Sequence, residues 1–422
     1  MRLFTIPSNR ECFKSATSYI EELSRVSNKY KEEFTFIIFG GGSINVDTQN
    51  YNAFKHWNQE NIFKIHYFCG DYQKKWIRSI LDVSKIKNKE KIYSILEPDT
   101  KKICYGAVLN KSFLAAVSLG TKYIHRRDSD TYLIDDKKFP LEMEIKYLGK
   151  KYCDFSELNS NIDSSIYFVG GNYNGEASGD FLRLYNANPE LLYRHVALNY
   201  PHKTKEEIID LAQKRFVDTS NRFATEKDVQ LVQDRMIELG NCAIFELFHY
   251  WPVAPALEIM ATDYFLHDIL FRYQLPNVYH NRRVKHVHTK ERQSKEWFIS
   301  YQLRSARYKV YSTFMNEAIS KINIDQTNIL NGSKNFAECL IDTLKNCNCY
   351  KAAYEKLVLL RNIYCDSKIS DFEEVARIIK DNEKNIINDV VNEIEKHISL
   401  IACWDDIIEA AKSVKIMDFI IG

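Results

Sequence analysis

Two aspartates one residue apart, Asp128 and Asp130, carry the clearest chemical signature in this chain. They follow a short apolar strand expected at residues 122–125, and Arg126 and Arg127 stand directly before them. Carboxylates are the hard oxygen ligands that Mg²⁺ and Mn²⁺ prefer, usually together with phosphate oxygens and waters. An ion held there can neutralise the charge that develops on a diphosphate leaving group. The spacing therefore favours a cation and phosphate site, whereas a solvated turn is the alternative interpretation.

The elements that must position these aspartates alternate between strand and helix along the first half of the chain. Continuous apolar runs predict strands at residues 2–6, 34–39, 65–68 and 122–125, and helical spacing predicts helices at 11–26, 71–84 and 106–119. Such alternation indicates a parallel sheet with helices on its faces. Ligands of such sheets sit beyond the carboxyl ends of the strands, where Asp128 and Asp130 stand.

The downstream part of the chain changes from mixed to helical character near Glu296. Before that point we expect strands at 165–169 and 283–288, and helices at 189–196, 205–216, 226–239 and 262–273. After it, long amphipathic patterns cover residues 296–322, 336–347, 350–363 and 371–397. The pattern predicts two domains, an α/β domain at residues 1–295 and an α-helical C-terminal region at 296–422.

The bulk composition excludes several classes of protein. The 58 basic and 56 acidic residues give a net charge of +2, which argues against nucleic acid as a partner. Ten scattered cysteines form no CxxC pair, so a structural zinc site is not expected. No secretory signal and no apolar run long enough to span a membrane is found, so we expect a reducing cytoplasm with free thiols.

The start of the chain resembles a known family. Thr5-Ile6-Pro7-Ser8-Asn9-Arg10 is similar to the opening of family 2 glycosyltransferases, whose first strand and loop bind the nucleotide. The helix Tyr105 to Lys111, which carries Asn110, and the later Asp-Ser-Asp motif follow in the family's order. The resemblance, over about residues 1–290, implies a GT-A fold: Rossmann-like, with a mostly parallel sheet and helices on both faces. The residues implied in nucleotide-sugar binding are Pro7, Ser8, Asn9, Arg10, Gly41, Asp71, Asn110, Arg127, Asp128, Ser129 and Asp130.

The resemblance is imperfect at the end of the second strand. Family members place two acidic residues there, where this chain has Phe39-Gly40-Gly41-Gly42-Ser43. The acid that commonly contacts uracil or ribose is therefore missing, and Asp71, after the third strand, is the candidate to replace it. A UDP-sugar is the favoured donor, but the departure leaves the nucleotide open.

Two further roles are implied by the same resemblance. Asp263, at the start of the 262–273 helix, matches the position of the acid that deprotonates the acceptor in inverting enzymes. A helix-capping role is the alternative, and Glu176 and Asp180 are the replacement bases. Family members often place a histidine at the strand that here spans 283–288, as a third metal ligand. His286 and His288 point to the same face of that strand, so the predicted Mn²⁺ or Mg²⁺ ligands are Asp128, Asp130, His286 and His288.

These features together predict a metal-dependent glycosyltransferase that moves a sugar from a nucleotide sugar to an acceptor. Inversion is expected, and retention is the alternative if Asp263 positions the substrate instead of acting as the base. The acceptor remains open between a small metabolite, a peptide, a protein and a glycan. Two other functions stay open: nucleotidyl transfer, and a non-catalytic nucleotide-binding or scaffold protein with a degenerate GT-A domain. The helical C-terminal region is a candidate cover for the site, acceptor-binding surface or homodimer interface.

Overall fold

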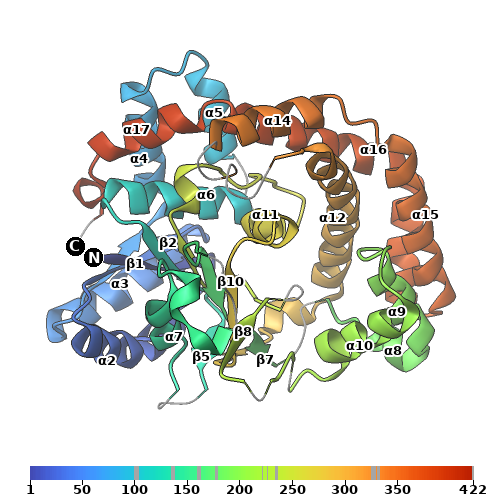
Figure 1. Ribbon diagram of the computed structural model, residues 1–422, viewed down its shortest axis with the longest axis horizontal. Helices are drawn as coiled ribbons and strands as arrows, with labels where there is room; N and C mark the ends of the chain where they lie inside the picture. Colours follow the sequence, from blue (N-terminus) through green and yellow to red (C-terminus); the bar gives the residue numbers. More distant parts are fainter. Residues whose placement is uncertain are drawn as a thin grey trace.

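A computed structural model of the chain has a mixed α/β architecture built around one large, mostly parallel sheet (Figure 1). It describes residues 1–420 apart from 99–103, 135–137, 159–162, 176–178, 221, 226, 233–235, 325–328 and 330–332. The large sheet has the strand order β3-β2-β1-β4-β9-β6-β10-β8. Its strands are β1 (Arg2–Ser8), β2 (Phe34–Gly40), β3 (Ile65–Phe68), β4 (Tyr123–Arg127), β6 (Phe168–Gly170), β8 (Val229–Leu231), β9 (Asn241–Phe245) and β10 (Asn277–His280).

The sheet changes direction between β1 and β4. The chain adds β2 and β3 on one side of β1 in parallel, and then returns to place β4 in parallel on the other side. β9 runs antiparallel between β4 and β6, and β8 runs antiparallel to β10. A smaller sheet joins β5 (Thr131–Leu133), β11 (Val284–His286) and β7 (Tyr173–Asn174). A switch point such as that between β1 and β4 opens a crevice at the carboxyl ends of the strands.

Helices cover both faces of the sheet. The helices of the first two thirds of the chain are α1 (Phe13–Ser18), α2 (Ile20–Tyr30), α3 (Ile44–Glu60), α4 (Gly70–Val83), α5 (Lys89–Leu96), α6 (Tyr105–Ser118), α7 (Pro140–Tyr147), α8 (Leu182–Ala187), α9 (Pro189–Ala197), α10 (Lys205–Ala212) and α11 (Phe265–Arg272). Alternate side chains of a strand point to opposite faces. Accordingly Leu3 and Ile37 join one core with α4 and α6, whereas Phe4 and Ile38 join a second core with α2, α3 and α7.

The C-terminal helices pack directly on the α/β part. They are α12 (Lys295–Lys321), α14 (Ser333–Lys345), α15 (Tyr350–Asp366), α16 (Ser370–Ile401) and α17 (Trp404–Ser413), and they curve around one side of the molecule in Figure 1. The Trp404 indole donates to the Phe248 carbonyl over 2.9 Å, and Ser118 donates to the Val414 carbonyl over 2.6 Å. Their apolar faces extend the core that contains α4 and α6. No helix in the described part of the chain is both long and apolar enough to cross a bilayer.

Most of the predicted elements are confirmed, but one helix is wrong. Strands predicted at 34–39 and 65–68 are β2 and β3, and the helices predicted at 106–119 and 296–322 are α6 and α12. The helix expected at 226–239 instead contains β8, whose Val229 to Leu231 pair antiparallel with β10. Pairing with a neighbouring strand overrides local helix preference there. All ten cysteines are free thiols, as expected.

The buried histidines generate a prediction about stability and pH. Burial lowers the pKa of His125, His280 and His397 to about 4, and it lowers the pKa of His195 well below the ordinary value of 6.5. Between about pH 4.5 and 6.5 these histidines are therefore protonated in the unfolded chain but largely neutral in the folded chain. Burial raises the pKa of Glu22 to about 7, which offsets one of these four protons. We expect the free energy of unfolding to fall as the pH is lowered, by about 1.4 kcal/mol per pH unit for each uncompensated histidine.

Urea denaturation at pH 6.5 and pH 5 measures this loss. The variant His397→Gln, which keeps a donor for the Pro252 carbonyl, should make the difference between the two pH values smaller. His56→Gln, at a side chain that is 73% exposed, is the matched control and should leave the difference unchanged. Equal stability of the wild type at both pH values would contradict the expectation.

Candidate functional site

A cavity of about 970 Å³ lies beyond the carboxyl ends of β1, β2, β3 and β4. The loops after these strands form its floor, and α6 forms one wall. Side chains from α12 and from the 3₁₀ helices η5 (Thr262–Tyr264) and η6 (Lys290–Gln293) complete it. The cavity therefore occupies the place where an open α/β sheet binds its ligand, and the C-terminal helical region contributes to it.

The switch point of the sheet is bridged by an ion-pair cluster centred on Asp130. Arg10, which follows β1, donates to the Asp130 carboxylate over 3.0 Å and to the Thr289 hydroxyl over 3.1 Å. Arg292 from η6 contacts the same carboxylate and lies 2.9 Å from Nε2 of His286. Burial opposes the charge on Arg292, but the Asp130 carboxylate raises its pKa above the ordinary value. The predicted residues Arg10, Asp130 and His286 are thus brought together.

A second cluster is centred on Arg126, whose side chain is 4% exposed. Its guanidinium donates to Asp263 over 2.9 Å and lies 3.4 Å from Asp128. Tyr173 donates to the other oxygen of the Asp128 carboxylate over 2.6 Å. Burial raises the pKa of Asp263 although Arg126 opposes that rise. The structure therefore joins Asp128 and Asp263, two predicted site residues 135 positions apart, through Arg126.

Arg127 lies on the opposite face of the sheet from the cavity. Its side chain is fully buried, donates to Glu144 of α7 over 2.8 Å and lies 3.8 Å from Glu22 of α2. Glu144 also accepts a hydrogen bond from, or donates one to, His125 over 2.6 Å. Burial opposes ionisation of Glu144, yet Arg127 and His125 lower its pKa to about 2. Arg127, predicted to bind the nucleotide sugar, therefore does not line the cavity, whereas its neighbour Arg126 does, because successive residues of a strand point to opposite faces.

The two predicted histidine ligands are separated. His286 lines the cavity, stacks on Tyr173 with ring centroids 5.1 Å apart, and lies 3.8 Å from Asp130. His288 follows the end of β11 and contacts the Trp297 ring, with centroids 5.9 Å apart. Among the described residues, no three His, Cys, Asp or Glu side chains are gathered closely enough to hold an ion by themselves. Of the four predicted metal ligands, Asp130 and His286 are thus the two that the structure places side by side.

The loops after β1 and β2 line the other end of the cavity. Ser8 accepts from the Arg10 amide over 3.3 Å and donates to the Arg10 carbonyl over 2.8 Å, which folds the loop back on itself. Asn50 of α3 clamps the same loop by donating to the Arg10 carbonyl over 2.8 Å. The other predicted residues on this part of the lining are Pro7, Asn9, Gly41, Asp71 and Ser129.

An acid that sequence analysis missed stands beside the glycine loop. Asp47, in the first turn of α3, accepts from the Gly42 amide over 3.1 Å and from the Tyr67 hydroxyl over 2.8 Å. Asp71 is instead at the rim, with a side chain that is 83% exposed. Asp47 therefore supplies the carboxylate that the sequence lacks at the end of β2. Its position in the first turn of a helix that follows three glycines is the sequence signal that could have identified it.

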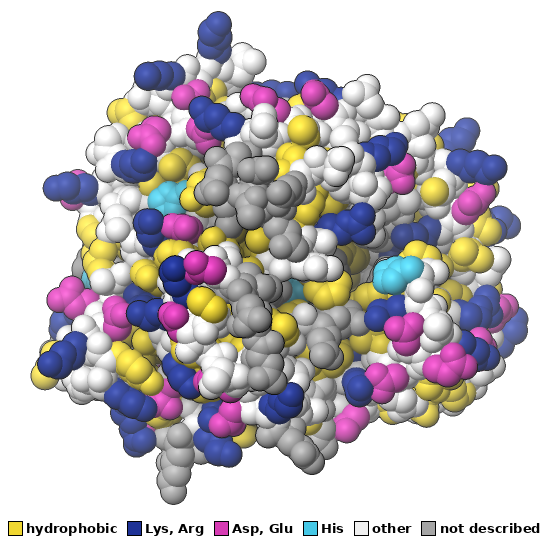
Figure 2. Space-filling model, in the orientation of Figure 1, with side chains coloured by type: hydrophobic (Ala, Val, Ile, Leu, Met, Phe, Trp, Pro, Cys, Tyr) yellow, Lys and Arg dark blue, Asp and Glu magenta, His cyan; other side chains and the backbone are white. Residues whose placement is uncertain are grey.

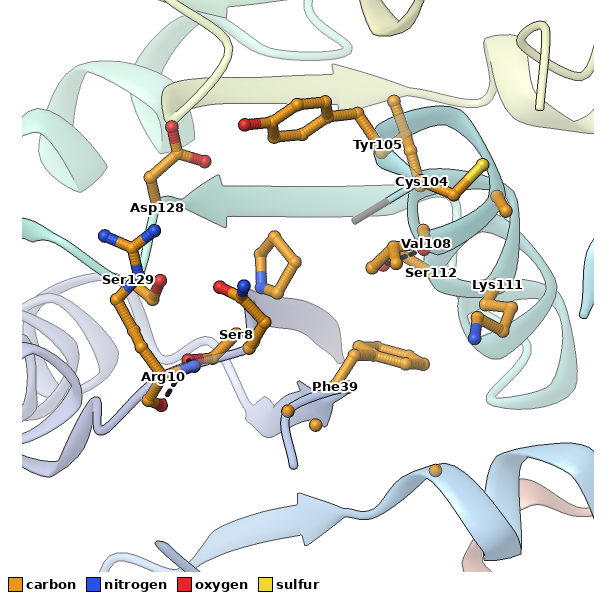
Figure 3. Close-up of a pocket in the computed structure, with 18 of the residues that line it drawn as sticks. Ser8, Arg10, Phe39, Cys104, Tyr105, Val108, Lys111, Ser112, Asp128 and Ser129 are labelled. Atoms are coloured by element: carbon orange, nitrogen blue, oxygen red, sulfur yellow. Dashed lines mark hydrogen bonds between the residues drawn. The ribbon is translucent and has the colours of Figure 1, made fainter. Parts of the chain in front are cut away.

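On α6, the predicted residue Asn110 does not line the cavity, but its neighbour Lys111 does. Asn110 is buried and exchanges hydrogen bonds of 2.9 Å with the backbone of Val253, so it fixes α6 in place. Lys111 lines the cavity and pairs with Glu97 over 3.1 Å. Figure 3 shows Lys111 and Tyr105 on the α6 side of the cavity, with Tyr105 extending toward Asp128.

Two of the predicted bases are not part of the described cavity. Glu176 lies outside the described residues, and Asp180 pairs with Arg183 over 3.4 Å away from the lining. Several residues that sequence analysis missed do line the cavity, and most of them come from segments far from the first four strands. They are Asp47, Tyr105, Glu238, Tyr264, Arg292, Tyr301 and Arg304.

The outer surface offers no comparable feature on the face shown in Figure 2. Lys and Arg side chains are interspersed there with Asp and Glu, without a basic stripe among the described residues. Surfaces that bind nucleic acids usually gather basic side chains on one face. The cavity is therefore the feature that we take as the functional site.

Gly240 provides a test of this site. A Cβ at this position would lie 2.0 Å from the Tyr173 hydroxyl and 2.3 Å from Cγ of Asp128, so Gly240→Ala must displace both side chains. A Cβ at Gly70, on the opposite lining, would meet nothing within 4 Å, which makes Gly70→Ala the matched control. We expect Gly240→Ala to weaken ligand binding in the cavity at least about tenfold, equivalent to about 1.4 kcal/mol, and Gly70→Ala to leave it unchanged. Calorimetric titration with a nucleoside diphosphate measures both, and equal affinities would contradict the expectation.

Comparison with known proteins adds little about activity. No curated protein sequence matches the chain. Among solved structures, the mannosyltransferase PcManGT from Pyrobaculum calidifontis in complex with GDP-Man and Mn²⁺ aligns at 11% identity with a TM-score of 0.35, over 99% of this chain and 88% of that one. Likeness at this level assigns no activity. One family model matches residues 2–419, and the chain therefore belongs to the family described as Family of unknown function (DUF6271).

Proposed function

We propose that the chain is a glycosyltransferase of the GT-A type, which binds a nucleoside-diphosphate sugar in the 970 Å³ cavity and transfers the sugar with inversion. One observation carries the proposal. Asp128, Asp130, Asp263 and His286 come from three distant parts of the chain, yet all four line this single cavity at the ends of the parallel strands. Random carboxylates in solvated turns would not converge in this way.

The donor lies across the ends of β1 and β2 in this proposal. The nucleoside lies against the Gly40 to Gly42 loop, which lines the cavity, and Asp47 offers an acceptor for hydroxyl or base N–H groups. Arg10 and Arg292 stand at the switch point, where their guanidinium groups suit the diphosphate. The sugar then points toward Arg126 and Asp263 on the far side of Asp128.

A divalent cation fits this site as a companion of the diphosphate. Asp130 and His286 provide one carboxylate and one imidazole 3.8 Å apart, a donor set that suits Mn²⁺ or Mg²⁺ completed by phosphate oxygens and waters. When bound, the ion neutralises charge that develops on the leaving diphosphate. Arg292, which contacts both ligands, supplies positive charge at the same place.

A thermal-shift screen of UDP- and GDP-sugars, with and without Mn²⁺, tests the donor. We expect one nucleotide sugar to stabilise the wild type, by about 2.7 kcal/mol at a concentration of 100 times its Kd. Release of nucleoside diphosphate on incubation would support sugar transfer, whereas release of pyrophosphate would show nucleotidyl transfer instead. The absence of any stabilisation would leave only a non-catalytic role.

Calorimetry with Mn²⁺ tests the metal pair. Because two protein ligands alone hold a cation weakly, we expect Mn²⁺ to bind at least about tenfold more tightly when a nucleoside diphosphate is present. The variant Asp130→Asn should abolish this gain. Asp210→Asn, at an exposed carboxylate paired with Lys214, is the matched control and should preserve it. A gain that survives Asp130→Asn unchanged would remove Asp130 from the metal site.

A further inference from the structure

The cavity holds a second carboxylate that can act on an acceptor. Glu238 lies in the turn before β9, two residues before Gly240, whose backbone packs against Asp128 and Tyr173. Its side chain lines the cavity and is only partly buried. Tyr264 donates a hydrogen bond of 2.6 Å to one oxygen of this carboxylate. Glu238 therefore reaches the cavity from a segment that carries none of the predicted site residues.

The surroundings of Asp263 and Glu238 differ in charge. Asp263 is 8% exposed and is held by the Arg126 guanidinium over 2.9 Å, so taking up a proton would break a buried ion pair. The Glu238 carboxylate instead accepts a hydrogen bond from the neutral Tyr264 hydroxyl, and its charge also acts on the buried guanidinium of Arg222. Asp263 is therefore engaged in holding Arg126, whereas Glu238 presents its partly exposed carboxylate to the cavity.

A group of tyrosines and arginines shares the end of the cavity near Glu238. Burial raises the pKa of Tyr301, on α12, and the charges of Tyr105, Arg292, Glu238 and Arg304 act on the same hydroxyl. The Arg304 guanidinium lies over the Tyr105 ring, 5.1 Å from its centroid. These side chains all line the cavity. Hydroxyl, guanidinium and aromatic groups together suit a polyhydroxylated acceptor such as a glycan.

We infer that Glu238 is the catalytic base and that the acceptor hydroxyl binds between Glu238 and Tyr301. The inference rests on the proposed sugar transfer. In the step, the acceptor oxygen forms a bond to the anomeric carbon while its proton moves to the Glu238 carboxylate. The bond between the anomeric carbon and the phosphate oxygen breaks, and the nucleoside diphosphate leaves with that electron pair. Tyr264 is a positioning residue, because its hydroxyl orients the carboxylate.

Hydrolysis of the donor by water tests the assignment without a known acceptor. UDP-glucose and GDP-mannose are the probes, with Mn²⁺ present and nucleoside diphosphate release as the measurement. We expect Glu238→Gln, which keeps an oxygen for the Tyr264 hydroxyl, to lower the release rate at least about 100-fold. Its affinity for the nucleoside diphosphate and its thermal midpoint should stay at the wild-type values. The low-pH limb of the wild-type rate profile should also flatten in this variant.

Three comparisons make the result specific. Glu142→Gln, at a surface carboxylate paired with Lys29, is the matched control and should hydrolyse at the wild-type rate. Tyr264→Phe should lower the rate about threefold to tenfold, because the carboxylate loses its orienting bond. Asp263→Asn should lower the rate less than Glu238→Gln and should weaken donor binding more, since it releases Arg126.

Different outcomes separate the inference from the proposed function. A Glu238→Gln variant that hydrolyses within threefold of the wild type overturns the role of Glu238 alone, as does a rate lost only in Asp263→Asn. A wild type that binds a nucleotide sugar but leaves it intact also overturns the role of Glu238. A wild type that binds neither probe, nor any nucleoside diphosphate, overturns the proposed sugar transfer and the inference with it.

Discussion

The carboxyl end of β4 is held by two buried arginines, Arg126 and Arg127, that point in opposite directions. The pleat of the strand sends Arg126 toward the cavity and Arg127 toward α7. A buried guanidinium is costly unless carboxylates surround it, so each arginine commits neighbouring elements to supply them. Glu144 meets Arg127 over 2.8 Å, and Asp263 meets Arg126 over 2.9 Å. The position of β4, and with it that of the cavity, is therefore fixed from both faces of the sheet.

This arrangement explains why the aspartates after β4 can serve a ligand. Their backbone turn is anchored, because the Thr131 hydroxyl donates to the Asp128 carbonyl over 2.8 Å and accepts from the Tyr19 hydroxyl over 2.7 Å. Neither aspartate is needed to neutralise Arg127, since Glu144 does so. Asp128 and Asp130 instead face the crevice between β1 and β4, where the strand order reverses. The Arg127–Glu144 ion pair thus stabilises the fold, whereas Asp128 and Asp130, which follow Arg127, line the cavity.

The sequence predicts those parts of the site that follow directly from strand ends. Apolar runs predict β1 and β4, and parallel strands align their carboxyl ends, so Arg10 and Asp130, which follow these two strands, could be expected together. Which of Arg126 and Arg127 faces the cavity depends on the register of β4 between β1 and β9, which no local pattern fixes. Glu238 and Arg292 come from segments whose path depends on β9 and α12, and β9 is only five residues long. The periodicity of apolar residues predicts local helices and strands, but it does not predict which distant strands pair.

The distribution of charge in the cavity gives it a direction. Three guanidinium groups and three carboxylates form two clusters: Arg10, Arg292 and Asp130 in one, and Arg126, Asp128 and Asp263 in the other. Taken alone, the first cluster carries an excess positive charge and the second an excess negative charge. In a displacement at a sugar, negative charge grows on the leaving phosphate and positive charge grows at the anomeric carbon. If the diphosphate of a donor lies at the first cluster, the excess positive charge there stabilises the leaving phosphate. The excess negative charge of the second cluster then stabilises the anomeric carbon, and the opposite orientation would stabilise neither. Because ion pairs within each cluster hold these charges before any ligand arrives, the proposed sugar transfer would need little reorganisation, which is how preorganised charge lowers a barrier.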